Sequence, residues 1–264
     1  AITTMDADHM EIYDSLEGIE QGFTAFAKQV KNTLLVSYGL PLSNLTYGFE
    51  ANASYSIPSF KPHNEGYLFD VVTPEGEEKA LYFNQIGKHN LVNALCAISL
   101  AHLEGVSFES IRKGLASFPG IERRMNQYHL DDLLLIDDYA HHPVELKAVL
   151  KTIKSTYPKR KNGIVFQPHL FSRTRDFMCD FATVLSEFDE VILLDIYPAR
   201  ELPIEGVTSD NLLNLITNPN KKKVQKVDLL SAIEESKADL LVMAGAGDIG
   251  LEVQKILMQL NPTT

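Results

Sequence analysis

The sequence has little cysteine. Its 264 residues include two cysteines, Cys96 and Cys179, and neither has a cysteine or histidine at the spacing of a C-x-x-C or C-x-x-H pair. This absence excludes a disulfide framework and a cysteine-based zinc site. It also fits a reducing compartment, so we expect a cytoplasmic protein.

The sequence also lacks an excess of positive charge. It has 24 Lys and Arg residues against 35 Asp and Glu residues, a formal net charge of -11. Nucleic-acid binding needs clustered cations to neutralise phosphates, so we expect no nucleic-acid partner. The one basic run, Lys221–Lys223, is interpreted as a solvated turn.

Long apolar runs and an initiator methionine are missing as well. No uninterrupted apolar stretch of about 18 residues occurs and no signal peptide is recognisable, so we expect a soluble protein without a membrane partner. We also expect a monomer or weak dimer. The chain opens with Ala1-Ile2-Thr3-Thr4-Met5, which resembles the end of a strand. We therefore interpret the start of the chain as a cut.

The first half mixes two hydrophobic periods. Helical spacing occurs over residues 15–30, 89–104 and 108–117. Between the first two helices, short strand-like runs separated by turn residues predict a small antiparallel sheet. These runs cover residues 45–49, 54–60, 67–72 and 80–83. The breakers at residues 118–121 predict a domain boundary, giving domains 1–120 and 121–264.

The second half alternates strands and helices regularly. Near-continuous apolar strands followed by amphipathic helices predict a parallel sheet with helices on both faces, an α/β fold of Rossmann-like type. The expected strands are residues 133–136, 163–166, 191–194, 223–227 and 240–243. The first expected helix begins at Pro143 and ends before Pro158. The others cover residues 177–185, 209–216, 229–236 and 249–260.

Polar side chains follow several of these strands. Asp137–His142, Gln167–His169 and Asp195–Tyr197 each come directly after an expected strand. Ligand-binding groups in parallel sheets collect at the carboxyl ends of strands, so we favour a functional site over simple strand termination or a helix cap at His142. Arg173 and Arg175 lie nearby in sequence, and a guanidinium can hold an amino-acid carboxylate through two hydrogen bonds.

The segment Gly245–Gly250 matches the pattern G-x-G-x-x-G between a strand and a helix. In dinucleotide-binding proteins this pattern follows the first strand, with an acidic residue about 20 residues later. Here it belongs to the last strand–helix unit. We therefore favour close packing with a phosphate or carboxylate contact over a dinucleotide site.

Two short motifs stand out in the first half. Asp6-Ala7-Asp8-His9 offers carboxylate and imidazole ligands suited to magnesium or manganese. Gly87-Lys88-His89-Asn90 with Asn93 begins a helix, and asparagine amides have the donor and acceptor needed to bind an adenine edge. A simple turn and N-cap explain the second motif equally well, and both interpretations stay open.

In this order, the motifs resemble the Mur ligase family, and within it the branch that adds L-alanine. The ligase that recycles murein tripeptide is the nearest alternative, since it shares a similar Asp-Asp-Phe-Ala-His-His-Pro run. The matching segments are Asp6–Met10, Gly87–Asn93, Gly120–Arg124, Asp137–Pro143, Val165–His169 with Arg173–Arg175, and Gly245–Gly250.

The resemblance implies a division of the chain. The first part corresponds to the later part of a central α/β ATPase domain, and the second to the C-terminal Rossmann-like domain that binds the amino acid. It implies nucleotide-binding roles for His89, Asn90, Asn93, Arg124, Asp137 and Asp138. Asp138 would hold the ribose with Asp137 supporting it, and His9 would be a magnesium ligand.

For the amino-acid side, the resemblance implies contacts with L-alanine from Tyr139, His169, Arg173 and Arg175. The catalytic candidates are Arg124, His141, His142 and His169, without a choice between the two adjacent histidines. Leu170 stands where many relatives have arginine, which leaves the carboxylate contact to Arg173 and Arg175.

The implied reaction uses ATP and Mg²⁺ to phosphorylate the carboxylate of UDP-N-acetylmuramic acid, after which the amine of L-alanine attacks the acyl phosphate. The Gly-rich loop ending in Gly-Lys-Thr and the UDP-sugar domain are absent from this sequence, so we expect the chain alone to be inactive. Three other hypotheses remain: a dinucleotide-binding oxidoreductase built on Gly245–Gly250, a metal hydrolase using His9, Asp138 and the histidine pair, and a non-catalytic binding module.

Overall fold

The computed structural model describes residues 1–5, 15–42 and 44–260, and the chain divides into two units, Ala1–Pro119 and Gly120–Thr264. His9, the expected metal ligand, lies outside the described residues. No helix in the described part of the chain is long and apolar enough to cross a membrane.

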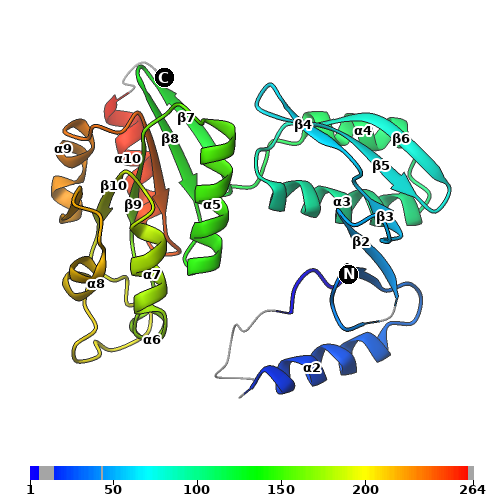
Figure 1. Ribbon diagram of the computed structural model, residues 1–264, viewed down its shortest axis with the longest axis horizontal. Helices are drawn as coiled ribbons and strands as arrows, with labels where there is room; N and C mark the ends of the chain where they lie inside the picture. The colour runs from blue at the N-terminus through cyan, green and yellow to red at the C-terminus, as the bar shows by residue number, and fades with distance from the viewer. Residues whose placement is uncertain (6–14, 43, 261–264) are drawn as a thin grey trace. The chain divides into compact units, whose positions relative to one another are not determined.

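A six-stranded mixed sheet forms the centre of the first unit (Figure 1). The strand order is β1-β2-β3-β5-β4, and β6 also pairs with β5. The strands are β1 (Leu35–Ser37), β2 (Leu45–Gly48), β3 (Tyr55–Ser56), β4 (Phe60–His63), β5 (Gly66–Thr73) and β6 (Gly76–Phe83). The helices are α2 (Leu16–Gln29), α3 (Lys88–Leu103) and α4 (Phe108–Ser117).

The antiparallel pairing expected here is confirmed around β5, but the sheet as a whole is mixed. The pairs that β5 forms with β3, β4 and β6 are antiparallel, but β1, β2 and β3 pair in parallel. The single run expected at residues 54–60 is broken into β3 and β4 around Pro58, whose nitrogen cannot donate a ladder hydrogen bond. The sequence analysis missed β1 because three residues are too few to show a period.

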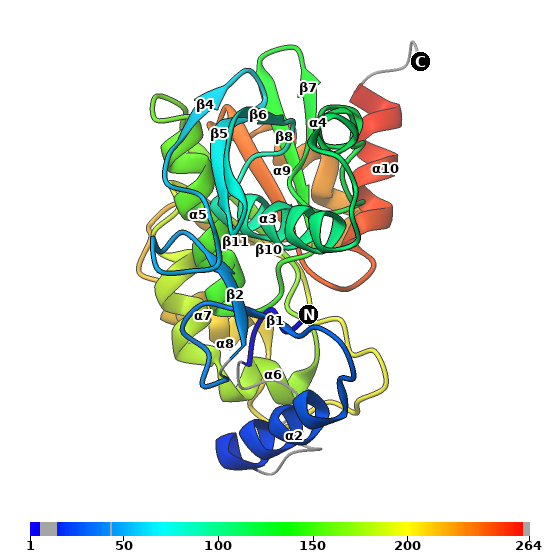
Figure 2. The same ribbon diagram turned by 90° about the vertical axis from the view of Figure 1, so that its right-hand side faces the viewer.

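Two hydrophobic clusters hold this unit together. Leu91, Leu95 and Ile98 of α3 pack with buried sheet residues such as Tyr47 and Phe69. The apolar side of α2 packs instead on a smaller cluster around Val36 of β1. Figure 2 accordingly shows α2 at the β1 end, away from α3 and α4. The start of α3, with the candidate asparagines, is therefore fixed by the larger cluster.

The second unit is a six-stranded sheet in the order β11-β10-β9-β12-β8-β7. Its strands are β7 (Asn126–Leu130), β8 (Leu133–Asp138), β9 (Asn162–Phe166), β10 (Glu190–Leu193), β11 (Lys221–Lys223) and β12 (Leu240–Ala244). Its helices are α5 (Pro143–Thr156), α6 (Phe171–Asp176), α7 (Met178–Leu185), α8 (Ser209–Leu215), the short 3-10 helix η1 (Lys226–Asp228), α9 (Leu229–Glu234) and α10 (Ile249–Leu260).

The α/β architecture with helices on both faces is confirmed. Helices α9 and α10 share one hydrophobic cluster on the sheet, and α5, α7 and α8 lie on the opposite face (Figure 1). All pairs from β8 to β11 are parallel, but β7 is an antiparallel edge strand that the sequence analysis missed. Its residues, Asn-Gln-Tyr-His-Leu, are too polar to stand out as a buried strand.

The solvated turn expected at Lys221–Lys223 is also wrong, because these lysines form edge strand β11. Each ammonium has protein partners. Lys221 donates to the carbonyls of Leu213 and Ile216 at the end of α8, and Lys223 pairs with Asp195 and Asp210. Lysine on an edge strand also discourages pairing with other chains.

The topology brings the candidate residues together. Strand β12 runs between β8 and β9, in register with Asp138 on one side and Phe166 on the other. The carboxyl ends of the three strands therefore place Asp137–His142, Gln167–His169 and Gly245–Asp248 at one edge of the sheet.

Candidate functional site

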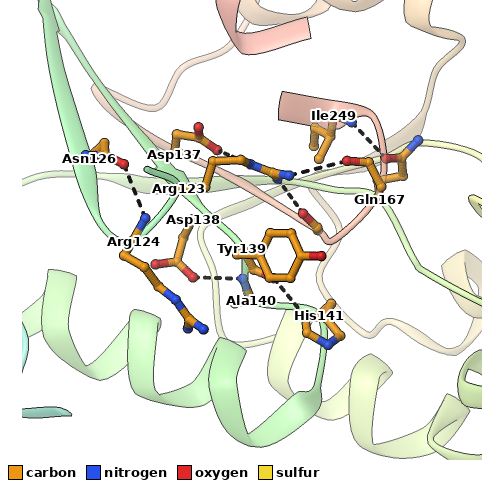
Figure 3. Close-up of polar contacts among 12 residues, drawn as sticks. Arg123, Arg124, Asn126, Asp137, Asp138, Tyr139, Ala140, His141, Gln167 and Ile249 are labelled. Carbon is orange, nitrogen blue, oxygen red and sulfur yellow. Dashed lines mark hydrogen bonds and ion pairs between the residues drawn. The ribbon is translucent and has the colours of Figure 1, made fainter. Parts of the chain in front are cut away.

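Asp138 and its neighbour Asp137 are both buried at this edge. The Oδ1 of Asp138 accepts a hydrogen bond from the Ala140 amide at 2.8 Å, and its Oδ2 accepts one from the Met125 amide at 2.9 Å (Figure 3). Burial raises the pKa of Asp138 to about 6, although the two amide donors act in the opposite direction. Each carboxylate oxygen retains a second lone pair for a ligand hydroxyl.

Asp137 is neutralised by Arg123, a residue that the sequence analysis did not select. The Nε of Arg123 lies 3.3 Å from Oδ1 of Asp137, and its Nη atoms donate to the carbonyls of Gly245 and Gly247. Burial raises the pKa of Asp137, and the guanidinium partly offsets this. The signal available in the sequence was the buried acid pair itself, which requires a cation.

Four aromatic rings form a continuous row, which we call the aromatic row: Tyr139, His141, His169 and Tyr197. Consecutive ring centroids are 5.3, 6.1 and 5.7 Å apart. They come from the ends of β8, β9 and β10, as strand-end clustering predicts. The sequence analysis noted Tyr197 only as part of a strand-end cluster.

His169 is held neutral within this row. Burial lowers its pKa to about 4, assisted by the nearby positive charge of Arg173 and by His141. Its buried Nδ1 has no hydrogen-bond partner among the described residues. A neutral imidazole can accept a proton, which a charged one cannot.

The two adjacent histidines have different surroundings. His142 is the N-cap of α5: its ring accepts from the Val144 amide, Glu145 closes the capping box, and the ring packs on Phe177. His141 instead lies in the aromatic row, with Nδ1 2.8 Å from the carbonyl oxygen of Tyr139. The helix-cap interpretation of His142 therefore holds, and His141 becomes the better functional candidate.

The polar groups of the Gly245–Gly250 segment already have partners within the protein. Gln167 accepts from the Ile249 amide at 3.0 Å and donates to Asp248 at 2.8 Å, and Lys226 pairs with Asp248. A Cβ at Gly245 would lie 2.6 Å from the carbonyl oxygen of Gln167. The start of α10 thus carries a carboxylate and a satisfied amide, which favours close packing over pyrophosphate binding.

The two candidate arginines also differ. Arg175 is exposed, and its Nε forms an ion pair with Asp176 at 2.7 Å. Arg173 is half-buried, and its charge contributes to the low pKa of His169. The structure thus places Arg173, but not Arg175, in electrostatic contact with the aromatic row.

Leu170, between His169 and α6, has a strained backbone. Its φ of 71° and ψ of 136° lie in a region that favours glycine. The conformation is fixed because its amide donates to the carbonyl of Tyr197 and its carbonyl accepts from Thr174.

We predict that Leu170→Gly stabilises the protein by about 1 kcal/mol, because relief of such strain contributes on the order of 1–3 kcal/mol, while the greater unfolded-state entropy of glycine offsets about 0.4–1 kcal/mol of it. Urea unfolding at neutral pH measures this. A matched control is Leu202→Gly, because Leu202 is exposed and its φ is negative. Destabilisation by both substitutions would contradict the prediction.

The candidates in the first unit lie at the start of α3. Asn90 donates through Nδ2 to the carbonyl of Ile86 at 2.7 Å, while Asn93 is exposed. Gly87 has a φ of 102°, and a Cβ there would lie 2.7 Å from the His89 ring, so that ring folds back over the glycine. The turn interpretation is therefore correct for this segment, and the side-chain amide oxygens of Asn90 and Asn93 can still bind a ligand.

A metal centre does not emerge from the described residues. Within residues 1–5, 15–42 and 44–260, no three His, Cys, Asp or Glu side chains are grouped so that they could hold an ion. The metal-hydrolase hypothesis used Asp138 and the histidine pair, and the amide contacts of Asp138 and the cap role of His142 do not favour it.

Comparisons with family models identify both units. Residues 1–101 match the Mur ligase middle domain, and residues 123–251 match the Mur ligase, glutamate ligase domain. The UDP-N-acetylmuramate–L-alanine ligase of Flavobacterium johnsoniae is 49% identical over 98% of this chain and 59% of its own length. The ligase of the same name from Porphyromonas gingivalis is 41% identical over 94% of this chain and 57% of its own length.

Solved structures show the same fold. The UDP-N-acetylmuramate-alanine ligase MurC of Thermotoga maritima has a TM-score of 0.79 at 22% identity, covering 98% of this chain and 58% of that one. The murein peptide ligase of Psychrobacter arcticus has a TM-score of 0.63 at 18% identity, covering 99% and 57%. The chain thus spans less than two thirds of the length of these relatives.

Proposed function

Because this chain belongs to the Mur ligase family of ATP-dependent amide-bond ligases, we propose that it carries the ATP and L-alanine sites of a UDP-N-acetylmuramate–L-alanine ligase of peptidoglycan synthesis. The observation that carries this proposal is the 49% identity to a relative of that name over 98% of the chain. The murein-recycling alternative is supported by a likeness of fold at 18% sequence identity and by its similar Asp-Asp-Phe-Ala-His-His-Pro run.

In this proposal, each unit contributes residues that bind the nucleotide. Asp138 accepts hydrogen bonds from the ribose hydroxyls, for which its free lone pairs are suited. Arg124, exposed beside it, neutralises phosphate charge. Asn90 and Asn93 bind the adenine, with His89 shaping the turn before them. His9 remains the proposed Mg²⁺ ligand.

The aromatic row is the proposed amino-acid site. Arg173 holds the carboxylate of L-alanine, with Tyr139 and His141 beside it. Neutral His169 accepts a hydrogen bond from the ammonium group through an unprotonated ring nitrogen and so orients the amine. Arg175, which pairs with Asp176 at the surface, contributes little.

A completed enzyme tests the function. We define it as this chain joined to the part of the Flavobacterium johnsoniae enzyme that it does not match. Phosphate release should depend on ATP, Mg²⁺, UDP-N-acetylmuramic acid and L-alanine together, and the 264-residue chain alone should show none.

Three other outcomes would reject the assignment. Phosphate release with the murein tripeptide but not with L-alanine would assign the chain to the recycling branch. Tight calorimetric binding of NAD or NADP would support the oxidoreductase hypothesis. A folded completed enzyme that releases no phosphate with any of these substrates would remove the ligase proposal altogether.

A further inference from the structure

Arg123 is a buried cation at the carboxyl edge of the second sheet. Its side chain is 19% exposed and contacts Asp137, Gly245 and Gly247, which belong to this edge. The backbone at Arg123 has a φ of 57°, which turns the side chain inward while the neighbouring Arg124 is exposed. Two adjacent arginines therefore face different environments.

The guanidinium joins three separate parts of this edge. It pairs with Asp137 at the end of β8 and donates to the carbonyls of Gly245 and Gly247 after β12. Its Cζ also lies 5.1 Å from the ring centroid of Tyr139, a cation–π contact. Figure 3 shows the side chain crossing beside this ring.

Through these contacts Arg123 reaches both ends of the aromatic row. Tyr139, the first ring, lies against the guanidinium itself. At the other end, the loop that accepts from Arg123 packs on Tyr197, since a Cβ at Gly247 would lie 2.7 Å from its ring. Shifting the guanidinium would therefore move the frame that holds the rings.

The Asp138 carboxylate is fixed in a different way. Its two oxygens accept from the amides of Met125 and Ala140, which are backbone groups. The side chain of Arg123 does not contribute to either bond. A change in that side chain should therefore affect the two subsites unequally.

We propose that Arg123 is a positioning residue for the amino-acid subsite: by joining Asp137, Tyr139 and the Gly245–Gly247 loop, it sets the geometry of the aromatic row without touching substrate. This inference rests on the proposed function. It assigns Arg123 a role separate from that of Arg124, which faces the nucleotide.

Gly250 provides an independent way to disturb the same contact. A Cβ at Gly250 would lie 2.8 Å from Nε and 3.0 Å from Cζ of Arg123, so Gly250→Ala must displace the guanidinium while leaving its charge in place. Gly250 lies in α10, where alanine is the better helix former, so the variant should fold. Gly114→Ala in α4 is the matched control, because nothing lies within 4 Å of its Cβ position.

The first measurement uses the 264-residue chain itself. The ring resonances of Tyr139, assigned by comparison with Tyr139→Phe, should shift in Arg123→Lys and in Gly250→Ala but stay unchanged in Gly114→Ala. Unchanged Tyr139 resonances in both test variants would overturn the proposal. This readout does not depend on ligase activity.

The second measurement is steady-state kinetics of the completed enzyme. Arg123→Lys and Gly250→Ala should each raise the KM for L-alanine about tenfold, the effect of one misplaced charge-assisted contact, with the KM for ATP and kcat changed less than about twofold. An unchanged alanine KM, or equal losses in kcat and both KM values, would overturn the proposal. An inactive wild-type enzyme would reject the proposed function, and the Tyr139 resonances would still decide the role of Arg123.

Discussion

Asp138→Asn in the completed enzyme is expected to lower kcat/KM for ATP at least about a hundredfold. An amide in this position can accept only one of the two backbone hydrogen bonds that Asp138 now receives, and it offers fewer lone pairs to the ribose. A lost hydrogen bond to a charged group costs about 1.5–3 kcal/mol, and the misplaced ribose adds to this. Initial rates with varied ATP at saturating alanine measure the effect.

The matched control is Asp132→Asn in the exposed turn between β7 and β8. It makes the same chemical change in the same hairpin and should leave kcat/KM for ATP unchanged. Equal losses in both variants would show that the hairpin, and not the Asp138 carboxylate, matters. An unaffected Asp138→Asn enzyme would exclude the ribose contact.

The same substitution should change how stability depends on pH. The pKa of Asp138 is about 6 in the folded protein, against 3.8 for an unperturbed aspartate, so the folded state binds more protons between these values. Its contribution to stability is fully present below the lower pKa and is lost as pH rises through the higher one. The stability of the wild type relative to Asp138→Asn should therefore fall by about 2 kcal/mol between pH 4 and pH 7.5. Urea unfolding of both proteins at the two pH values tests this, and a constant difference would contradict it.

Arg173→Met is expected to raise the KM for L-alanine about a hundredfold. It removes a half-buried cation whose charge acts on His169 of the aromatic row, and charge-assisted hydrogen bonds to a carboxylate contribute on the order of 1.5–3 kcal/mol. The KM for ATP should change little. Kinetics of the completed enzyme with varied alanine provide the measurement.

Arg175→Met serves as the comparison. Arg175 is exposed and pairs with Asp176, and surface ion pairs contribute little, so the alanine KM should stay within about twofold of the wild type. A larger effect from Arg175 than from Arg173 would reverse the assignment of the carboxylate contact.

The sequence predicted most of the second unit because its strands are short apolar runs bounded by clear helix signals. Pro143 begins α5 as expected, and β8, β9, β10 and β12 lie where the apolar runs predicted them. The failures were edge strands: β7 was not predicted, and β11 (Lys221–Lys223) overlaps the strand expected at residues 223–227 only at Lys223. β7 and β11 pack on one side only, so their residues need not be apolar, and a lysine run or a polar pentapeptide carries no strand period.

The candidate site shows a similar limit. Strand-end logic found Asp138, Tyr139, His141 and His169, because chain order and the parallel sheet together bring these residues to one edge. It did not find Arg123, whose inward direction depends on a left-handed backbone conformation that arginine rarely adopts. Nor could it separate His141 from His142, since only the capping geometry distinguishes them.

The place of β12 in the sheet has a consequence for biosynthesis. This strand is translated last of the six, yet it pairs with both β8 and β9 at the centre. While the residues from 240 onward are still inside the ribosome, the rest of the unit can form only two partial sheets, β7-β8 and β9-β10-β11, each with an unpaired apolar edge. Such long-range pairing is slow and exposed to aggregation, so the sheet of the second unit can close only after β12 has been synthesised and has inserted between β8 and β9.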